Sequence, residues 1–211
     1  MATKKNEAEK VAPRLSVIVT CYNNADTLPK CLDALIGQTE RNIEIVCVND
    51  GSTDKTLDVL KKYAKKDARI AIVDNKSNAG VSKTRNDGIE ASSAEYIMFC
   101  DGDDYYDEQM CEKMLRAIDE SGADLAISEI KITYEAFENM RSSDEQYYSL
   151  KYAGLQDISD ELVQKTDLSP VNKIFRREKL DAFKIRFPEG LHYEDAYFCS
   201  AYFCASSTIY F

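Results

Sequence analysis

Acidic and amide side chains follow several apolar runs of this chain, at the point where each run ends. The polar stretches read TCYNN (20–24), NDGSTD (49–54), DNKSN (74–78) and DGDD (101–104). If the apolar runs are parallel strands, their carboxyl ends meet at one edge of a sheet, where ligands bind in open α/β sheets. Carboxylates gathered there repel one another unless a cation joins them. Oxygen ligands without His or Cys suit Mg²⁺ or Mn²⁺ rather than zinc, so these stretches predict a hard-metal site that grips a diphosphate.

Each polar stretch also has a purely structural interpretation. Residues 50–54 could form a tight turn and the N-cap of a helix, and residues 101–104 could be a solvated loop before the next helix. Tyr22 and Asn23 alone would carry no functional meaning. The functional interpretation therefore depends on all these stretches lying on successive strand ends of one sheet.

The elements that must position these side chains alternate regularly. Short apolar runs predict strands at 15–20, 43–48, 70–73, 96–100 and 125–128. Amphipathic spacing predicts helices at 27–38, 53–66, 81–91 and 108–121. This β-α-β order, with near-continuous apolar strands, predicts an α/β fold with a mostly parallel central sheet and helices on both faces.

The pattern changes after about Tyr134. Residues 135–155 are polar and aromatic without a clear period, and we expect a loop or mobile insertion there. The remaining expected elements are a short helix at 157–166, a strand at 171–175 and a final helix at 194–205. The chain ends inside a strand-like run at 208–211, so we expect the domain to continue beyond this point.

Composition excludes several classes of protein. The net charge is −10 and the isoelectric point is about 4.8, which argues against a nucleic-acid binder because such a protein needs a cationic surface. No stretch approaches the roughly 18 apolar residues of a membrane helix. Residues 1–13 form a polar lead-in that lacks a signal-peptide core and that we expect to be disordered. Residues 14–211 are long enough to form a single domain.

The cysteines and lysines bear on location. Seven cysteines occur without a CxxC pair, which predicts a reduced, cytoplasmic protein rather than a disulfide scaffold. The basic run Lys61, Lys62, Lys65 and Lys66 is interpreted as a solvated helix face. Its alternative is a peripheral contact with the inner face of a membrane.

The ordered series strand-TCYNN, strand-VNDGSTD, DNKSNAGVSKTRNDG, strand-CDGDD and a later YED resembles the motifs of family-2 glycosyltransferases. The resemblance covers roughly residues 15–195 and includes the order and approximate spacing of the motifs. It implies the GT-A fold and inverting transfer of a sugar from a UDP-sugar to a hydroxyl. The implied acceptor is a saccharide or a lipid-linked saccharide, in the synthesis of cell-surface polysaccharide or glycolipid.

The resemblance also implies roles for individual residues on the donor side. Thr20, Tyr22 and Asn23 match nucleotide-binding positions, with Tyr22 stacking on the base. Asp50 matches a carboxylate that accepts a hydrogen bond from uracil. Arg85 matches a basic residue that reaches the nucleotide.

Further roles concern the metal and the chemistry. Asp101, Gly102 and Asp103 match the family's DxD motif, so Asp101 would lie near the ribose and Asp101 and Asp103 would bind Mn²⁺ or Mg²⁺. Asp104 would hold a metal-bound water or a donor hydroxyl. Glu194 and Asp195 match the late acidic pair, whose Asp is the general base. On this view residues 14–134 form the nucleotide-sugar-binding half and residues 135–211 the acceptor-side half.

The chain departs from the family pattern in two places. Segment VNKIFRR (171–177) resembles an NKLFRR-like segment that packs near the donor, but Val171 stands where Trp is common. No QxxRW-like motif of processive synthases occurs. His192 is interpreted as a loop-surface residue, with a role in the site as the alternative.

Other functions are less consistent with the residues. A nucleotidyltransferase that makes the activated sugar usually has a Gly-rich, Arg-containing first loop, which TCYNNADT is not. A non-catalytic nucleotide-sugar-binding module remains an alternative, against which the intact Glu194–Asp195 pair argues. An EF-hand starting at Asp101 is rejected, because Tyr106 falls where Gly is required.

Overall fold

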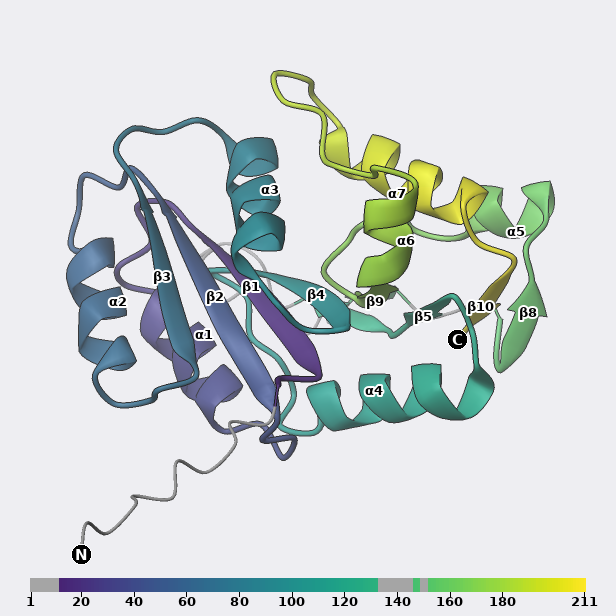
Figure 1. The fold of residues 1–211 in the computed structure, drawn as a ribbon, viewed down its shortest axis with the longest axis horizontal. Coiled ribbons are helices and arrows are strands. Elements are labelled where there is room, and N and C mark those ends of the chain that lie inside the picture. Colours follow the sequence, from purple (N-terminus) through teal and green to yellow (C-terminus); the bar gives the residue numbers. More distant parts are fainter. Residues whose placement is uncertain (1–11, 133–145, 149–151) are drawn as a thin grey trace, which may run out of the picture.

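An eight-stranded sheet forms the centre of the molecule (Figure 1). The computed structural model describes residues 12–132, 146–148 and 152–211. In spatial order the strands are β3 (Ile70–Asn75), β2 (Ile43–Asp50), β1 (Leu15–Cys21), β4 (Tyr96–Asp101), β9 (Lys173–Arg176), β5 (Leu125–Ile127), β10 (Thr208–Tyr210) and β8 (Leu155–Asp157). A separate antiparallel pair consists of β6 (Ile130–Ile132) and β7 (Gln146–Tyr148).

The strands of the first half are parallel, and their register brings the polar strand ends together. β1 pairs with β2 on one side and with β4 on the other, and β2 pairs with β3. Thr20 lies opposite Asp101, and Asp50 lies opposite Asn75. Because these strands point the same way, the predicted polar stretches meet at one edge of the sheet.

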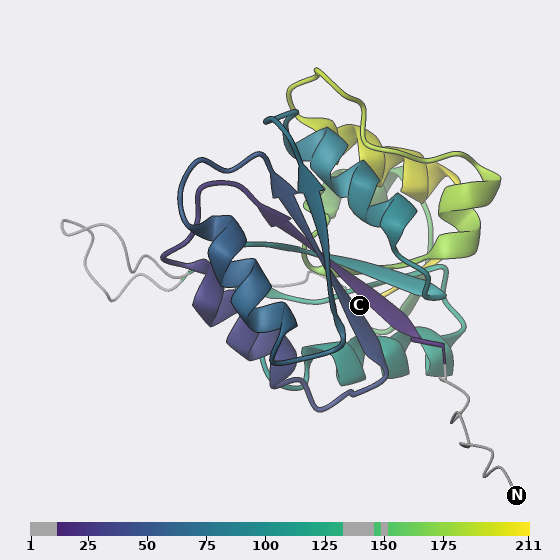
Figure 2. The same ribbon diagram turned by 60° about the vertical axis from the view of Figure 1, so that its left-hand side comes forward.

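Helices cover both faces of the sheet (Figures 1 and 2). Their bounds are α1 (Leu28–Ile36), α2 (Thr56–Ala64), α3 (Val81–Ala91), α4 (Met110–Ser121), α5 (Asp160–Lys165), α6 (Arg177–Ala182) and α7 (Glu194–Cys204). One apolar cluster joins the sheet to α1, α2 and α4, with Leu32, Leu60 and Leu115 in its centre. The other cluster joins the sheet to α3, α6 and α7. The expected α/β architecture with helices on both faces is therefore confirmed.

The second half of the sheet is mixed. β9 is antiparallel to both β4 and β5, between which it lies. β10 runs parallel to β5 and antiparallel to β8. The sheet as a whole stays mostly parallel. The direction of β9 could not be predicted from the spacing of apolar residues, because an antiparallel strand buried on both faces has the same composition as its parallel neighbours.

Several predicted boundaries shift in the structure. The helix expected at 53–66 starts at Thr56, because the Asp54 carboxylate accepts the Thr56 N–H at 2.9 Å and ends the preceding turn. Helix α6 and strand β8 were not predicted. The expected lead-in at 1–13 and the expected insertion at 135–155 fall largely outside the described residues.

Helix α3 packs unusually close to β1. Gly88 faces Ile18, and a Cβ on residue 88 would overlap the Ile18 side chain. Ile18 is fully buried, so α3 can lie this near only because residue 88 has no side chain. Among the described helices, none is long and apolar enough to cross a membrane.

Candidate active site

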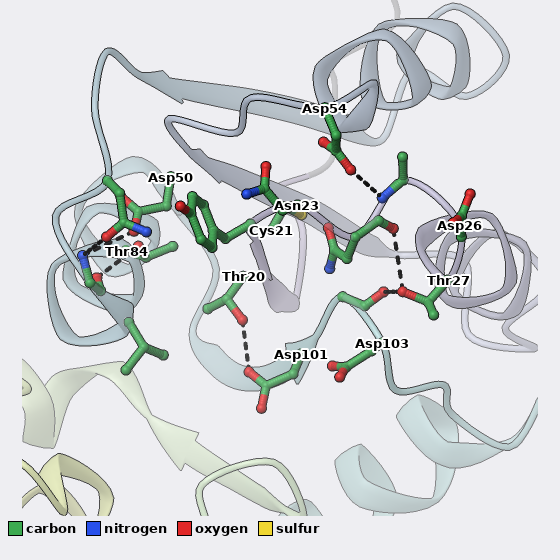
Figure 3. Close-up of a pocket in the computed structure, with 17 residues that line it drawn as sticks. Thr20, Cys21, Asn23, Asp26, Thr27, Asp50, Asp54, Thr84, Asp101 and Asp103 are labelled. Carbon is green, nitrogen blue, oxygen red and sulfur yellow. Dashed lines mark hydrogen bonds between the residues drawn. The ribbon is translucent and has the colours of Figure 1, made fainter. Parts of the chain in front are cut away.

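A cavity of about 590 Å³ opens at the carboxyl ends of the parallel strands (Figure 3). It is lined by residues 20–27 at the end of β1 and in the loop that follows, Asp50 and Asp54 at and after the end of β2, Asn78, Gly80, Val81 and Thr84 before and at the start of α3, and residues 101–103 at and after the end of β4. The predicted residues Thr20, Tyr22, Asn23, Asp50, Asp101, Gly102 and Asp103 are thus brought together. Asn78 belongs to the predicted polar stretch 74–78, whereas Val81 and Thr84 were not singled out from the sequence, because such residues at a helix start have no distinctive pattern.

The loop after β1 is fixed by the loop after β2. Asn23 adopts a left-handed backbone with φ of 50°, and its Oδ1 accepts the Thr53 N–H at 2.8 Å. The Asn23 N–H donates to Ser52 Oγ at 3.1 Å. Asp54 accepts the Ala25 N–H at 3.1 Å, in the contact drawn in Figure 3. Residues 52–54 therefore shape the loop that bears Tyr22, but the predicted N-cap within 50–54 is wrong, because the N-cap of α2 is Lys55.

Asp50 organises the third loop of the cavity. Its two carboxylate oxygens accept the backbone N–H groups of Ala79 and Gly80 at 2.9 and 3.0 Å, and the residue is 3% exposed. Gly51 has φ of 63°, and a Cβ there would overlap the backbone of Ser77. Asp50 thus holds the segment that leads into α3, in addition to lining the cavity.

Thr20 and Gly102 connect β1 to the DGDD loop. Thr20 Oγ1 donates to Asp101 Oδ1 at 2.7 Å (Figure 3), and the Gly102 N–H donates to the Thr20 carbonyl at 2.9 Å. A Cβ on residue 102 would overlap the Asn24 amide. Tyr22 is 48% exposed at this cavity, so its ring is accessible to a ligand.

Arg85 of α3 joins the DGDD loop to the late acidic pair. Its Nη2 donates to Asp101 Oδ1 at 3.3 Å, and its Nη1 donates to Glu194 Oε1 at 3.4 Å and to Asp195 Oδ1. The side chain is only 4% exposed, and its Cζ lies 5.1 Å from the Phe187 ring centre. The DGDD loop and the late acidic pair are therefore connected through one guanidinium.

The acidic loop after β4 has the donor chemistry of a hard-metal site. Desolvation, followed by the charges of Asp101 and Asp103, raises the pKa of Asp104 to about 6. A divalent cation would relieve this repulsion, so the residues fit Mn²⁺ or Mg²⁺. Within the described part of the chain, however, no three His, Cys, Asp or Glu side chains form a metal-holding group. A cation here would need further oxygen ligands from outside the protein.

Glu194 and Asp195 open helix α7 and remain partly accessible. Their side chains are 17% and 35% exposed. Burial raises the pKa of Asp195, and the Arg85 guanidinium opposes this, while the charges of Glu194 and Asp101 add to the rise. Asp195 is thus a carboxylate of increased basicity that borders solvent. His192 is exposed.

A second cavity of about 870 Å³ adjoins the first at Asp101 and Asp103. Its other walls include Tyr105, Glu129 and the loop that contains Asp167. This loop is anchored by the fully buried Lys173, whose Nζ donates to Asp167 Oδ1 at 3.0 Å and to the Ser169 carbonyl at 2.6 Å. The Asn-Lys pair of segment 171–177 was noted in the sequence, but its anchoring function depends on contacts that sequence spacing does not reveal.

All seven cysteines are free thiols, as expected from their number and spacing, and all but Cys204 are buried. They pack as small apolar groups, since Cys31 and Cys100 both belong to the apolar cluster beneath the DGDD loop. The site therefore contains no disulfide.

Comparison with known proteins identifies relatives of this arrangement. Residues 16–183 match the family model described as glycosyl transferase family 2. The putative glycosyltransferase EpsH of Bacillus subtilis is 34% identical over 212 residues, which cover 94% of this chain and 58% of EpsH. The poly(ribitol-phosphate) beta-glucosyltransferase of Bacillus spizizenii is 34% identical over 121 residues, or 56% of this chain and 19% of that protein.

Solved structures give the same result. The crystal structure of S. aureus TarS 1–349 superposes with a TM-score of 0.77 at 27% identity, covering 93% of this chain and 57% of that one. A complex of the same protein with UDP-GlcNAc also gives a TM-score of 0.77, at 26% identity. This chain thus spans little more than half the length of EpsH and of TarS 1–349, and its α/β architecture is the GT-A fold.

Proposed function

Because the chain belongs to glycosyl transferase family 2, we propose that it is an inverting enzyme that transfers a sugar from a UDP-linked donor to a hydroxyl of a saccharide or lipid-linked saccharide. The observation that carries this proposal is the arrangement around Arg85. It joins Asp101, at the cavity of nucleotide size, to Asp195, a partly exposed carboxylate of increased basicity. A donor bound in the cavity would lie beside a base supplied by a separate element.

The donor would be recognised by the loops of the first cavity. Tyr22 would stack on uracil, and Thr20, Asn23 and Gly102 would border the nucleoside. Asp50 would accept the uracil ring N–H while keeping the amides of Ala79 and Gly80, because each carboxylate oxygen has a second lone pair. The relative TarS binds UDP-GlcNAc, which supports a UDP-linked donor.

Asp101 and Asp103 would hold Mn²⁺ or Mg²⁺ together with the donor phosphates. The bound cation would neutralise the charge of the departing diphosphate. The two phosphates would also supply the oxygen ligands that the described protein residues lack. Desolvation is the main cause of the raised pKa of Asp104, and the charges of Asp101 and Asp103 add to it; this added repulsion is the part that a cation would relieve.

Asp195 would act as the general base. The acceptor oxygen forms its bond to the anomeric carbon as the bond from that carbon to the diphosphate breaks, and Asp195 takes the hydroxyl proton. The increased basicity of Asp195 favours this transfer. Glu194 would support the base by sharing Arg85.

The acceptor would present its hydroxyl group on the side of the second cavity. That cavity adjoins the first at the acidic loop and has Tyr105 and several carboxylates in its walls, which suit sugar hydroxyls. The named relatives include a transferase that acts on poly(ribitol phosphate), which supports a role in cell-surface polymer synthesis. For this activity we propose a cytoplasmic location, with Lys61 and Lys62 on the solvated face of α2.

Calorimetry and a hydrolysis screen test the proposal. UDP should bind in the presence of Mn²⁺, and CDP should bind much more weakly, because cytosine has no ring N–H for Asp50 to accept. Among UDP-, GDP- and CMP-sugars, only UDP-sugars should be hydrolysed or transferred. Equal affinity for UDP and CDP would contradict the role of Asp50, and turnover of GDP-sugars alone would contradict the UDP assignment.

A further inference from the structure

Arg85 is the structural link between the two chemical halves of the site. It extends from α3, and its three partners come from two other elements: Asp101 from the end of β4, and Glu194 and Asp195 from the start of α7. One guanidinium therefore faces three carboxylates. The Arg85 side chain is 4% exposed, and its partner Asp195 lies more than a hundred residues away in the sequence. This buried contact constrains where α7 begins relative to the donor cavity.

The two arms of the guanidinium serve different acids. Nη2 faces Asp101, which also accepts from Thr20, and Nη1 faces the acidic pair. The Phe187 ring lies 5.1 Å from Cζ, so the guanidinium plane has little freedom. Since the fork geometry of Arg is rigid, fixing one arm fixes the direction of the other.

Arg85 does not line the nucleotide cavity. The resemblance implied that this residue reaches the nucleotide, and that role remains a prediction. In the structure, however, Nη1 and Nη2 donate to carboxylates, and the buried Nε has no hydrogen-bond partner among the described residues. A second function of the side chain is therefore needed to explain its burial and its partners.

We propose that Arg85 is the positioning residue of the general base, holding the Asp195 carboxylate in the orientation that receives the acceptor proton and tying that orientation to Asp101 on the donor side. This inference rests on the proposed role of Asp195. Arg85 itself touches neither substrate in this scheme. It acts through Asp195, so its contribution exists only where Asp195 is present.

A double-mutant cycle tests this dependence. Arg85→Lys keeps the charge but loses the fork, and should lower kcat by on the order of 10- to 100-fold, the effect of a misplaced catalytic group. The Kd for UDP with Mn²⁺, measured by calorimetry, should stay within about twofold. Asp195→Asn should lower kcat by about 10²-fold or more. In the double variant, Arg85→Lys should add no further loss, since its effect passes through Asp195.

Each outcome of the cycle has a distinct meaning. Losses that multiply in the double variant, or a UDP Kd weakened tenfold by Arg85→Lys alone, would overturn the positioning role and favour direct nucleotide contact. Full activity of Asp195→Asn would instead refute the proposed base, and the positioning role with it. Arg116→Lys, an exposed arginine on α4, is the matched control and should change neither constant.

A second variant guards against loss of the fold. If Arg85→Lys does not fold, Phe187→Leu makes the same test, because it leaves every charge in place. Its melting temperature is measured alongside, since the Phe187 ring also packs against Phe99 and Phe198. This variant should lower kcat at unchanged UDP affinity, with no added effect in the Asp195→Asn background. Additive losses in that cycle would overturn the proposal.

Discussion

Asp101 and Asp103 lie two residues apart in one loop, yet their surroundings differ. Asp101 is half-buried, and one of its oxygens is shared between Thr20 and Arg85. Asp103 is exposed at the junction of the two cavities. Asp101 therefore has a structural function in addition to any ligand contact, whereas Asp103 is free to serve a ligand. A substitution of Asp103 therefore tests the proposed metal binding more directly than a substitution of Asp101, which would also remove structural contacts.

Asp103→Asn should reduce turnover of the UDP-sugar severely while leaving the fold intact, because the residue is exposed and its replacement removes no core volume. The measurement is transfer rate as a function of Mn²⁺, with the melting temperature as the control for folding. EDTA should abolish the activity of the parent enzyme. Activity of the variant near the parent level, or indifference of the parent to EDTA, would contradict the metal role.

The substitution Asp195→Asn distinguishes two possible roles of Asp195, the general base and a residue that only caps helix α7. Glu194 and Asp195 occupy the first turn of α7, where acids stabilise a helix through its dipole. Asn keeps the shape and much of the capping ability. If Asp195 is the base, transfer should fall by about 10²-fold or more while UDP affinity and melting temperature hardly change. More than a tenth of the parent rate in this variant would indicate that the proton goes elsewhere.

At the scale of elements, helix α3 is the part that carries Arg85 to its place. Its distance from β1 is set by Gly88 against the buried Ile18. Ile is β-branched and stiff at χ1, so it cannot turn away from a new methyl group. The position of Arg85 thus depends on a residue one turn further along the same helix.

Gly88→Ala should destabilise the protein by about 1–3 kcal/mol, the usual cost of overpacking a core. This sign is opposite to the gain of up to about 1 kcal/mol that Ala brings to a free helix interior. Chemical denaturation measures the difference. Glu90→Ala, on the exposed side of α3, is the control and should be neutral or slightly stabilising. Equal stability of the two variants would show that α3 can move off β1 without cost.

The strands also show which features of the fold could be predicted from the sequence and which could not. The ends of strands β1, β2 and β4 were predicted to within one or two residues, because apolar runs and turn residues are local signals in the sequence. The insertion of β9 between β4 and β5 was not predicted, since strand order depends on contacts between distant segments. For the same reason the acids were found as separate motifs, while the guanidinium that joins Asp101 to Asp195 became visible only in three dimensions.

At the scale of the whole molecule, Asp124 links three elements of the second half of the structure: β5, the turn before β10, and α6. It precedes β5, and its Oδ2 accepts the Ser207 N–H at 2.6 Å in the turn before β10. Its Oδ1 lies 3.1 Å from Lys179 Nζ of α6. Burial alone would raise the pKa of Asp124, but the Ser207 N–H and the Lys179 ammonium outweigh it, and the pKa is lowered from 3.8.

This lowered pKa predicts a pH dependence of stability. A carboxyl that is more acidic in the folded state stabilises the fold above its ordinary pKa, and this contribution is lost as the pH falls through the folded value. Asp124→Asn should therefore melt below the parent at pH 7, and the difference should narrow as the pH falls below about 4. Glu120→Gln, at an exposed site, should show no such convergence. A constant gap from pH 7 to pH 3 would contradict the role of Asp124.

The two halves of the sheet in Figure 1 can pair their strands at different times during synthesis. One half consists of β1 to β4, which follow one another in the chain, whereas in the other half β9 lies between the earlier strands β4 and β5. The strands from β1 to β4 can pair with one another as soon as they leave the ribosome. The facing edges of β4 and β5 must wait for β9, which is made much later. At about 5–20 residues per second, that wait lasts on the order of 4–15 s. During it two strand edges are open to wrong partners, so the nascent chain can have its first four strands paired while its second half is still vulnerable to aggregation.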